Sequence, residues 1–269
     1  MENPHRYFLQ YMLKNGVCNK VAALKYCKKL DNDNIKDIDD LKSLVIKINR
    51  EIGKQSLKIT YGTCEVTNQE MIVMLNTKND ALAKLQISFT PAHLEYFQAI
   101  LGEILNSENY RITFIVCLNL TSTLVLSLSR DKGQVVFDKW VKGGYFVKDQ
   151  NHVYLGLRTI FEFTSYLRSH CPNSLCKLCN ELVFIGKSCS KCSMVFHGYC
   201  ITKYLKNQVS CPSCDLKWES NDGLENSGID DSTAENDDIS VNNQSQNDTD
   251  NESVTDEPGP SSRKHRRRI

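Results

Sequence analysis

The chain has 269 residues, 41% of them hydrophobic, and its 33 Lys and Arg against 32 Asp and Glu residues give a formal net charge of +1 at pH 7. This length has room for about two domains of ordinary size plus tails, and the sequence contains no apolar run of about 18 residues that would predict a membrane span. The N-terminus MENPHRYFLQ lacks the apolar core that follows a basic start, so no secretory signal peptide is expected.

The first predicted domain, residues 1–80, opens with helices. The apolar and aromatic segment 5–15 is placed to end at Gly16, and Asn19 can cap a second helix. A third predicted helix carries an apolar stripe at helical spacing and ends at Gly53. The stripe consists of Leu41, Leu44, Val45, Ile48 and Ile52.

A hairpin is predicted after these helices. In residues 57–61, and again in residues 71–75, apolar side chains alternate with polar ones, as in half-buried strands. Helices followed by a two-stranded hairpin are the order of a winged-helix domain. We therefore predict a winged-helix domain over residues 1–80.

The same order recurs in residues 88–170, where we predict a second winged-helix domain. Thr90 can cap, and Pro91 can begin, a strongly amphipathic helix. A later helix over residues 131–142 is expected to stop at Gly143-Gly144. Residues 145–147 and 153–155 then predict a second hairpin.

Two further segments complete this region. The β-branched and Leu-rich composition of residues 112–129 suggests strands, although a second winged helix would need a helix there, and periodicity does not decide between them. A helix over residues 157–169 leads into Cys171-Pro172. The next Cys, Cys176, follows four residues later. Because this link is short, we expect the following domain to be docked in a fixed position.

Eight potential metal ligands lie within 39 residues of the C-terminal half. They form four pairs, with spacing C-x2-C, nine residues, C-x2-C, four residues, H-x2-C, ten residues, C-x2-C. In order they are Cys176, Cys179, Cys189, Cys192, His197, Cys200, Cys211 and Cys214. A C-x2-C pair on a tight turn can aim both thiolates at one ion, and two pairs complete the closed tetrahedral shell of a structural zinc.

Eight such ligands predict two zinc ions. The pairs can combine sequentially or in the interleaved order of RING and PHD modules, which we favour. Interleaving would place Cys176, Cys179, His197 and Cys200 in one site and Cys189, Cys192, Cys211 and Cys214 in the other. Disulfides are the alternative, but a chain without a secretory signal is expected in a compartment that keeps thiols reduced.

The last ligand pairs favour a RING variant over a PHD finger. A PHD finger has a longer segment between its sixth and seventh ligands, and here that segment is only ITKYLKNQVS. The ending Cys211-Pro212-Ser213-Cys214 is similar to the C-P-x-C ending of RING domains. The predicted domain over residues 171–218 is therefore a RING-like zinc domain.

Several Cys and His residues stand outside the paired pattern. Free Cys is among the most buried residue types, so packing is the predicted role of each unpaired one. These are Cys18, Cys27, Cys64, Cys117 and Cys171. His93 and His152 lack ligand partners at metal spacing and are expected to be structural or surface residues.

The final region, residues 219–269, differs in charge from the rest. It carries 13 acidic and 5 basic residues, whereas residues 1–218 carry 19 acidic and 28 basic ones. Its Asn, Ser, Asp and Glu residues cannot bury enough apolar surface to offset ordering, so a disordered acidic tail is predicted. The tail ends in a basic cluster that is a candidate nuclear-import signal or phosphate-binding arm. The cluster consists of Arg263, Lys264, Arg266, Arg267 and Arg268.

The predicted fold class is thus α+β, with tandem winged-helix domains, a two-zinc RING-like domain and a disordered tail. This organisation resembles the non-structural maintenance of chromosomes element one family, subunits of the SMC five/six complex. The resemblance covers roughly residues 5–218. Its most specific parts are CKLCNELVFIGKSCSKCSMVFHGYC, CPSCDLKW and GGYFVKDQNHVYLGLRTIFEF.

The resemblance implies a RING-type E3 ubiquitin ligase subunit that acts in DNA repair and chromosome maintenance in the nucleus. It also implies a MAGE-type winged-helix partner, a kleisin subunit and a ubiquitin-conjugating enzyme as partners, with zinc as the cofactor. A RING ligase forms no covalent intermediate and has no general base. No catalytic residue is therefore expected.

The resemblance places the conjugating-enzyme contacts at Leu178, before the second ligand, and at Pro212 in the last ligand pair. Two positions depart from many active RING domains. Asp215 stands where a basic residue orients ubiquitin, and Tyr204 stands in place of a Trp. The resemblance therefore implies a ligase that depends on its MAGE-type partner.

Two other functions compete with this interpretation. In the first, zinc stiffens a non-enzymatic scaffold, and the winged helices bind protein or, through a helix in the major groove, DNA. No helix dense in Lys and Arg stands out, which favours protein docking over direct DNA reading. In the second, a PHD-like module binds a histone tail, but Glu181 and Asp215 are its only acidic residues.

Overall fold

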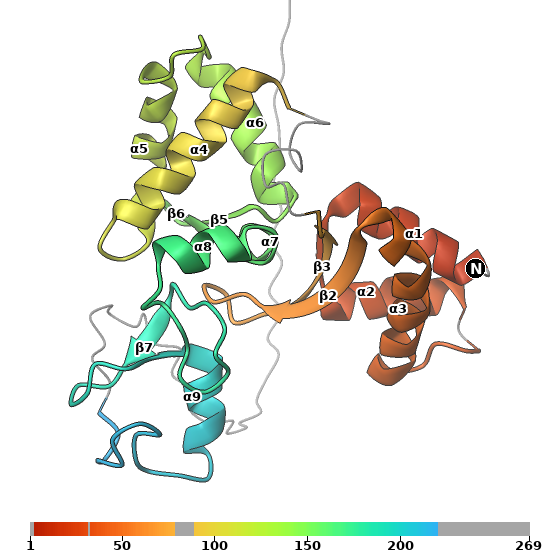
Figure 1. Ribbon diagram of the computed structural model, residues 1–269. Coiled ribbons are helices and arrows are strands. Elements are labelled where there is room, and N and C mark those ends of the chain that lie inside the picture. The colour runs from red at the N-terminus through yellow and green to blue at the C-terminus, as the bar shows by residue number, and fades with distance from the viewer. Residues whose placement is uncertain (1–2, 32, 79–88, 220–269) are drawn as a thin grey trace, which may run out of the picture. The chain divides into compact units, whose positions relative to one another are not determined.

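The computed structural model describes residues 3–31, 33–78 and 89–219. Within these ranges, none of the helices combines the length and apolar character needed to cross a bilayer. Apart from Glu219, the tail predicted over residues 219–269, together with its basic cluster, lies outside the described ranges. The predicted α+β architecture of winged helices followed by a RING-like domain is confirmed for the described residues (Figure 1).

The first module, residues 3–78, contains the predicted helices and hairpin together with an additional short strand. Its sheet has the antiparallel order β1-β3-β2. The elements are α1 (Asn3–Asn15), β1 (Val17–Asn19), α2 (Lys20–Leu30), α3 (Ile38–Ile52), the 3-10 turn η1 (Gly53–Gln55), β2 (Leu57–Thr63) and β3 (Glu70–Asn76). Strand β1 was not predicted, because three residues are too short to show an alternating pattern.

Local signals set the ends of these helices. Gly16 follows α1 with φ +73°, a left-handed conformation that favours glycine. The Asn19 side chain accepts a hydrogen bond from the Val21 amide (2.8 Å), which confirms its predicted capping role. Asp37 begins α3 through a reciprocal capping box with Asp40.

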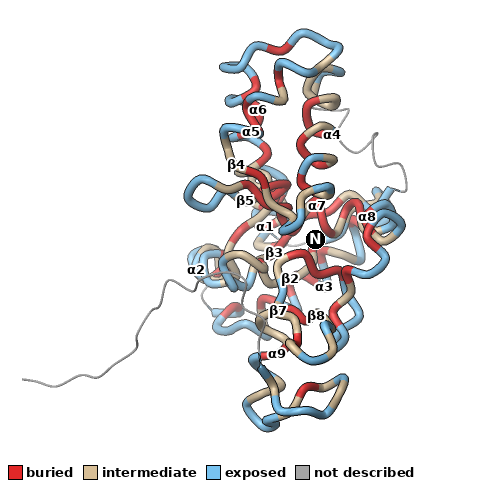
Figure 2. The backbone as a smooth tube through the Cα atoms, turned by 90° about the vertical axis from the view of Figure 1, so that its left-hand side faces the viewer, coloured by how far each residue is buried: buried red, intermediate tan, exposed pale blue. Residues whose placement is uncertain are grey.

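The core of the first module forms where α3 packs against the other helices and the sheet. All five residues of the predicted α3 stripe are buried, and they contact Phe8 and Met12 of α1 and Ile59 and Ile72 of the sheet. Figure 2 colours the buried residues red, and they recur along α3 between exposed ones. The amphipathic pattern therefore predicted correctly which face of α3 points inward.

The second module, residues 89–170, repeats this arrangement. Its sheet has the order β4-β6-β5, which matches the first sheet strand for strand. The elements are α4 (Pro91–Asn106), β4 (Arg111–Thr113), α5 (Phe114–Asn119), the 3-10 turn η2 (Leu120–Ser122), α6 (Arg130–Lys142), β5 (Phe146–Asp149), β6 (His152–Leu155), α7 (Leu157–Glu162) and α8 (Thr164–His170). Thr90 and Pro91 begin α4 as predicted.

Of the two alternatives left open for residues 112–129, the helix required by a winged helix is confirmed, and strand structure ends at Thr113. The Thr113 hydroxyl accepts a hydrogen bond from the Val116 amide (3.3 Å), which caps α5 at its first turn. The Tyr96 hydroxyl donates to the Cys117 carbonyl (3.0 Å) within the core and so holds the end of this short helix. Capping and tertiary packing thus override β propensity in this segment.

The helix predicted over residues 157–169 is divided into α7 and α8. The division occurs at Phe163, where φ is −106° and ψ is 19°. This change of direction brings the Phe163 side chain into the core, against Phe97 at a ring separation of 5.7 Å. Helical periodicity did not reveal the break, because a buried apolar residue at position 163 also fits the inner face of one continuous helix.

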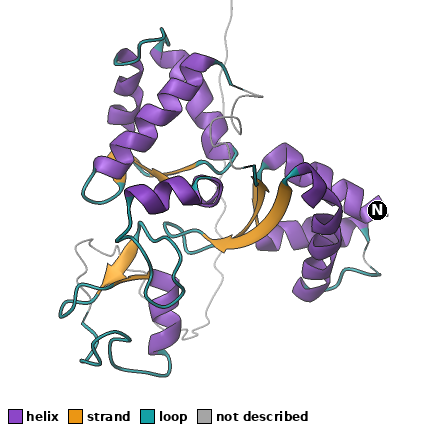
Figure 3. Ribbon diagram, in the orientation of Figure 1, coloured by secondary structure: helices purple, strands orange, loops and turns teal. Residues whose placement is uncertain are grey.

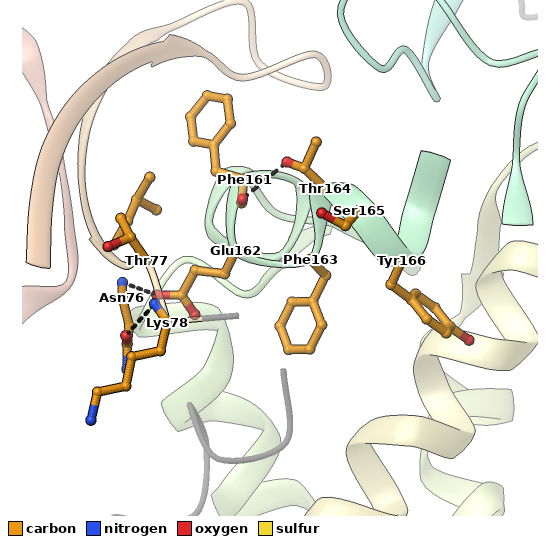
Figure 4. Close-up of a pocket in the computed structure, with 10 residues that line it drawn as sticks. Asn76, Thr77, Lys78, Phe161, Glu162, Phe163, Thr164, Ser165 and Tyr166 are labelled. Carbon is orange, nitrogen blue, oxygen red and sulfur yellow. Dashed lines mark hydrogen bonds between the residues drawn. The ribbon is translucent and has the colours of Figure 1, made fainter. Parts of the chain in front are cut away.

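The first and second modules pack together through a separate apolar cluster. Its buried members are Cys64, Val73, Leu75 and Leu157. Beside it, the fully buried Glu162 carboxylate accepts hydrogen bonds from the Asn76 amide (2.8 Å) and from Arg158 Nε (3.0 Å). Figure 4 shows the pocket lined by residues 75–78 and 161–166, with Glu162 directed at Asn76.

A pair of glycine substitutions tests the close approach between these modules. Gly144 has φ +80°, and a Cβ there would lie 2.8 Å from Val17 Cγ1. Gly144→Ala is expected to lower the free energy of unfolding by about 1–3 kcal/mol, because the conformation is left-handed and the space is filled. Gly102→Ala is expected to raise the same quantity by about 0.5–1 kcal/mol, because Gly102 lies within α4 and its Cβ would meet nothing within 4 Å.

Denaturant unfolding of the full chain, followed by circular dichroism, measures both changes. A Gly144→Ala protein as stable as the Gly102→Ala protein would contradict this packing.

Candidate metal centre

The third module, residues 171–219, contains little regular structure, as Figure 3 shows. Its elements are β7 (Gly186–Ser188), β8 (Val195–His197) and α9 (Gly198–Leu205), and β7 pairs with β8. Isolated bridges join Leu175 to Leu182 and Ser210 to Lys217. The three predicted Cys-x2-Cys pairs lie in turns outside these elements, whereas His197 ends β8 and Cys200 lies in α9.

The three Cys-x2-Cys pairs adopt one common turn. In each, the amide of the residue after the second Cys donates to the carbonyl of the first Cys, at 2.8, 2.9 and 3.0 Å in chain order. That residue has a left-handed backbone in every case. The three residues are Asn180, Ser193 and Asp215, with φ of 60°, 57° and 58°. The turn folds each pair so that both sulfur atoms face the same side, as a zinc knuckle requires.

The fourth pair lies at the start of a helix. His197 immediately precedes α9, and Cys200 lies in its first turn. The His197 Nδ1 atom is 3.3 Å from Cys179 Sγ and 3.8 Å from Cys200 Sγ. Because Nδ1 faces the sulfur atoms, it is the nitrogen in position to bind an ion.

These pairs come together in the interleaved order. Within each group of four, the potential ligand atoms all lie within 4.8 Å of one another. One group comprises Cys176, Cys179, His197 and Cys200, and the other comprises Cys189, Cys192, Cys211 and Cys214. We call them the first and the second tetrad.

The electrostatics of the tetrads fit a bound cation. Burial would raise the pKa of the Cys176 thiol, but the amides of His197, Cys179 and Leu178 lower it to about 7. In the same tetrad, burial and the neighbouring Cys176 and Cys179 raise the pKa of Cys200 to about 12. The thiols therefore oppose one another's ionisation, and a divalent cation is the partner that allows all of them to be thiolates.

The donor sets select the kind of metal. Thiolate and imidazole donors favour zinc over harder cations such as magnesium and calcium. In each tetrad four protein donors complete a tetrahedral shell, so no position is left for a catalytic water. Two structural zinc ions account for the two tetrads.

The predicted conjugating-enzyme contacts do not share one groove. Leu178 is 36% exposed and lines an open groove with Lys203 and Tyr204 of α9. Pro212 is half-buried and is not among the residues that line this groove. Asp215 is exposed on the last knuckle.

The unpaired cysteines behave as predicted, since all five are buried. A residue that the sequence did not reveal is Glu65, in the turn between β2 and β3. Its carboxylate accepts hydrogen bonds from the amides of Phe184 (2.9 Å) and Ile185 (2.6 Å), and it approaches His197 Nε2 to 3.3 Å. Phe184 is 119 positions away, so no local pattern could link Glu65 to the tetrad.

Substitution of one ligand tests the tetrads directly. Cys189→Ser is expected to lower the zinc content from two ions per chain to about one and to unfold the third module, because structural zinc contributes about 10–16 kcal/mol of apparent binding energy to folding. Cys171→Ser is the matched control, since Cys171 is also buried but lies outside both tetrads. Elemental analysis of the purified full chains measures zinc, and two ions in the Cys189→Ser protein would contradict the assignment.

Comparisons with known proteins agree with this architecture. A family model described as Nse1 non-SMC component of SMC5-6 complex matches residues 5–135, and a model described as RING-like domain matches residues 176–214. The human protein named Non-structural maintenance of chromosomes element 1 homolog is 26% identical over 226 residues, covering 81% of this chain and 85% of its own length. A Drosophila melanogaster protein of the same name is 27% identical over 182 residues, covering 66% of this chain and 77% of its own.

A solved structure shares the fold. A chain of a structure entitled "Nse1-Nse3-Nse4 complex" superimposes with a TM-score of 0.67 at 22% identity, covering 81% of this chain and 97% of that one. The matched segments contain the first winged helix and both tetrads. The chain is thus similar to the Nse1 non-SMC component of the SMC5-6 complex over residues 5–135, and to RING-like domains over residues 176–214.

Proposed function

We propose that this protein is a RING-type E3 ubiquitin ligase subunit of the SMC5-6 complex, acting in DNA repair and chromosome maintenance. The observation that carries the proposal is the exposed Leu178 side chain. It projects from the first zinc knuckle beside α9, where it lines an open groove. An apolar side chain held at such a rigid site can anchor a conjugating enzyme, as a central contact does in many protein interfaces.

The proposed mechanism needs no nucleophile from this chain. The eight residues of the tetrads bind zinc, and the zinc ions supply only rigidity. Leu178 and Pro212 contact a ubiquitin-loaded conjugating enzyme, whose own thioester reacts. The chain accelerates transfer by holding that enzyme in a productive orientation.

The last knuckle supports dependence on a partner. Asp215 places a negative charge where a basic residue would contact ubiquitin, so the isolated chain lacks one orienting interaction. We propose that a MAGE-type subunit supplies the missing orientation and that a kleisin subunit completes the assembly. The solved structure with a similar fold is named for Nse1, Nse3 and Nse4, which agrees with such an assembly.

Leu178→Ala tests the proposed contact. In the complex reconstituted with its MAGE-type partner, this substitution is expected to slow ubiquitin discharge from the conjugating enzyme about tenfold, because loss of a central apolar contact costs about 1–2 kcal/mol. The zinc content and the thermal unfolding midpoint should stay unchanged, since the side chain is exposed. Single-turnover discharge assays measure the rate.

Leu126→Ala is the matched control, because Leu126 is a similarly exposed leucine (43%) in the second module. It should discharge ubiquitin at the unsubstituted rate. If the intact complex discharges no ubiquitin above the conjugating enzyme alone, the chain is a zinc-stabilised scaffold instead. Steeply salt-dependent DNA binding by the full chain would then favour a role for the winged helices on DNA.

We also propose that the protein acts in the nucleus and that the C-terminal basic cluster directs it there. Deletion of residues 220–269, which keeps Glu219 and its contacts with Ser190 and Lys191, is expected to reduce nuclear accumulation of a fluorescent fusion. Zinc content and thermal stability should not change, because both tetrads precede the deletion. Nuclear levels equal to those of the full chain would remove the import role of the cluster.

A further inference from the structure

A buried carboxylate of the first module reaches the zinc-binding module. Glu65 lies in the turn between β2 and β3, which is closed by hydrogen bonds from the Cys64 amide to the Gln69 carbonyl (2.9 Å) and from the Asn68 amide to the Cys64 carbonyl (2.8 Å). The Glu65 side chain is only 6% exposed. A charged group removed from water to this degree is stable only when donors surround it.

The third module supplies those donors. Glu65 Oε2 accepts hydrogen bonds from the amides of Phe184 and Ile185, which precede β7. Glu65 Oε1 lies 3.3 Å from His197 Nε2. The two carboxylate oxygens thus have separate partners, the backbone for one and the imidazole for the other.

The imidazole is oriented by what surrounds it. His197 Nδ1 faces the sulfur atoms of the first tetrad, whereas Nε2 faces the Leu182 carbonyl (2.9 Å) and Glu65. The ring also stacks on Tyr199 at a centroid separation of 4.7 Å. Donation of the Nε2 proton to two oxygens keeps the Nδ1 lone pair free to bind a metal.

We infer that Glu65 is a positioning residue of the first tetrad, acting from outside the RING-like domain through His197. It fixes the ring orientation and tautomer of this ligand, and it ties the hairpin of the first winged helix to the zinc site. This inference rests on the proposed function, in which His197 binds zinc. Zinc retention in the first tetrad then depends on a residue more than a hundred positions away in the sequence.

Two substitutions distinguish the contact of the Glu65 carboxylate with His197 from its contacts with the Phe184 and Ile185 amides. In Glu65→Gln, the amide oxygen can still accept from Phe184 and Ile185, while the NH2 group faces the Nε2 proton and the interaction with His197 is lost. In Glu65→Ala, both sets of contacts are lost. Glu70→Gln is the control, since Glu70 lies in the same hairpin, is 63% exposed and pairs with Lys20.

Zinc release from the full chain into excess chelator, followed with a metal-sensitive dye, is the main measurement. In Glu65→Gln, one of the two ions should leave about tenfold faster, because loss of such a partner weakens metal binding by about 10–100-fold. The other ion should leave at the unsubstituted rate. Glu70→Gln should release both ions as the unsubstituted chain does.

Cadmium-113 NMR of the cadmium-substituted chain assigns the affected site, since one tetrad has three thiolates and the other has four. Glu65→Gln should move the three-thiolate resonance alone. Hydrogen exchange at the Phe184 and Ile185 amides should accelerate in Glu65→Ala and stay slow in Glu65→Gln. If Glu65→Ala does not fold, Glu65→Gln still provides the zinc and cadmium readouts.

Unchanged release and an unmoved resonance in Glu65→Gln would overturn the inference, as would an equal effect of Glu70→Gln. Neither result would bear on ubiquitin transfer. Conversely, a chain that binds two zinc ions but discharges no ubiquitin would refute the proposed ligase function while leaving the role of Glu65 intact.

Discussion

Metal binding is the interaction on which the third module depends. Its buried cluster consists of three cysteines together with Val183, Phe196 and Ile201. So small an apolar core cannot offset the conformational entropy of nearly fifty residues that lie mostly in loops. Zinc supplies that free energy. Burial and, after it, the neighbouring thiols raise the pKa of Cys200 to about 12, and a bound cation offsets both effects on the thiolate. The exposed groove beside Leu178 therefore exists only as a consequence of metal binding.

The knuckle geometry also explains the unusual residue at the proposed ubiquitin-facing position. The residue after each Cys-x2-Cys pair must adopt a left-handed backbone, and Asn and Asp reach this conformation more readily than other side-chain-bearing residues. Asn180 and Asp215 both follow this preference. Asp215 is thus well suited to its turn, whereas a long basic residue there would gain an interaction with ubiquitin at some conformational cost. The local fold and the proposed ligase activity thus place different demands on this position, which is consistent with the proposal that a partner subunit supplies the orientation.

Features with a local cause could be predicted from the sequence, and features with a distant cause could not. Asn19 and Thr90 cap their helices through amides two or three residues away, and each Cys-x2-Cys knuckle is set by five consecutive residues, so residue type and local spacing indicated them. The strands β1 and β4 are three residues long and exist because they pair with β3 and β6 of distant hairpins. The contact between Glu65 and His197 depends on how two modules pack. The α5 helix lies between these cases. Its cap at Thr113 is local, but the β-branched composition of the segment favoured strands, so the sequence alone did not decide between helix and strands.

Two of the contacts between modules, first with second and first with third, share one feature, which is a buried carboxylate that accepts backbone amides of the neighbouring module. Glu162 of the second module accepts the Asn76 amide at the end of β3, and Glu65 of the first module accepts two amides of the third. The amides at strand ends and in turns lack partners within their own sheet, and leaving one buried and unpaired costs about 1–3 kcal/mol. A carboxylate aimed at such groups therefore stabilises one relative placement of two modules and disfavours others. The RING-like segment is consequently not a self-sufficient unit, because part of the hydrogen bonding that surrounds its first tetrad comes from the first winged helix.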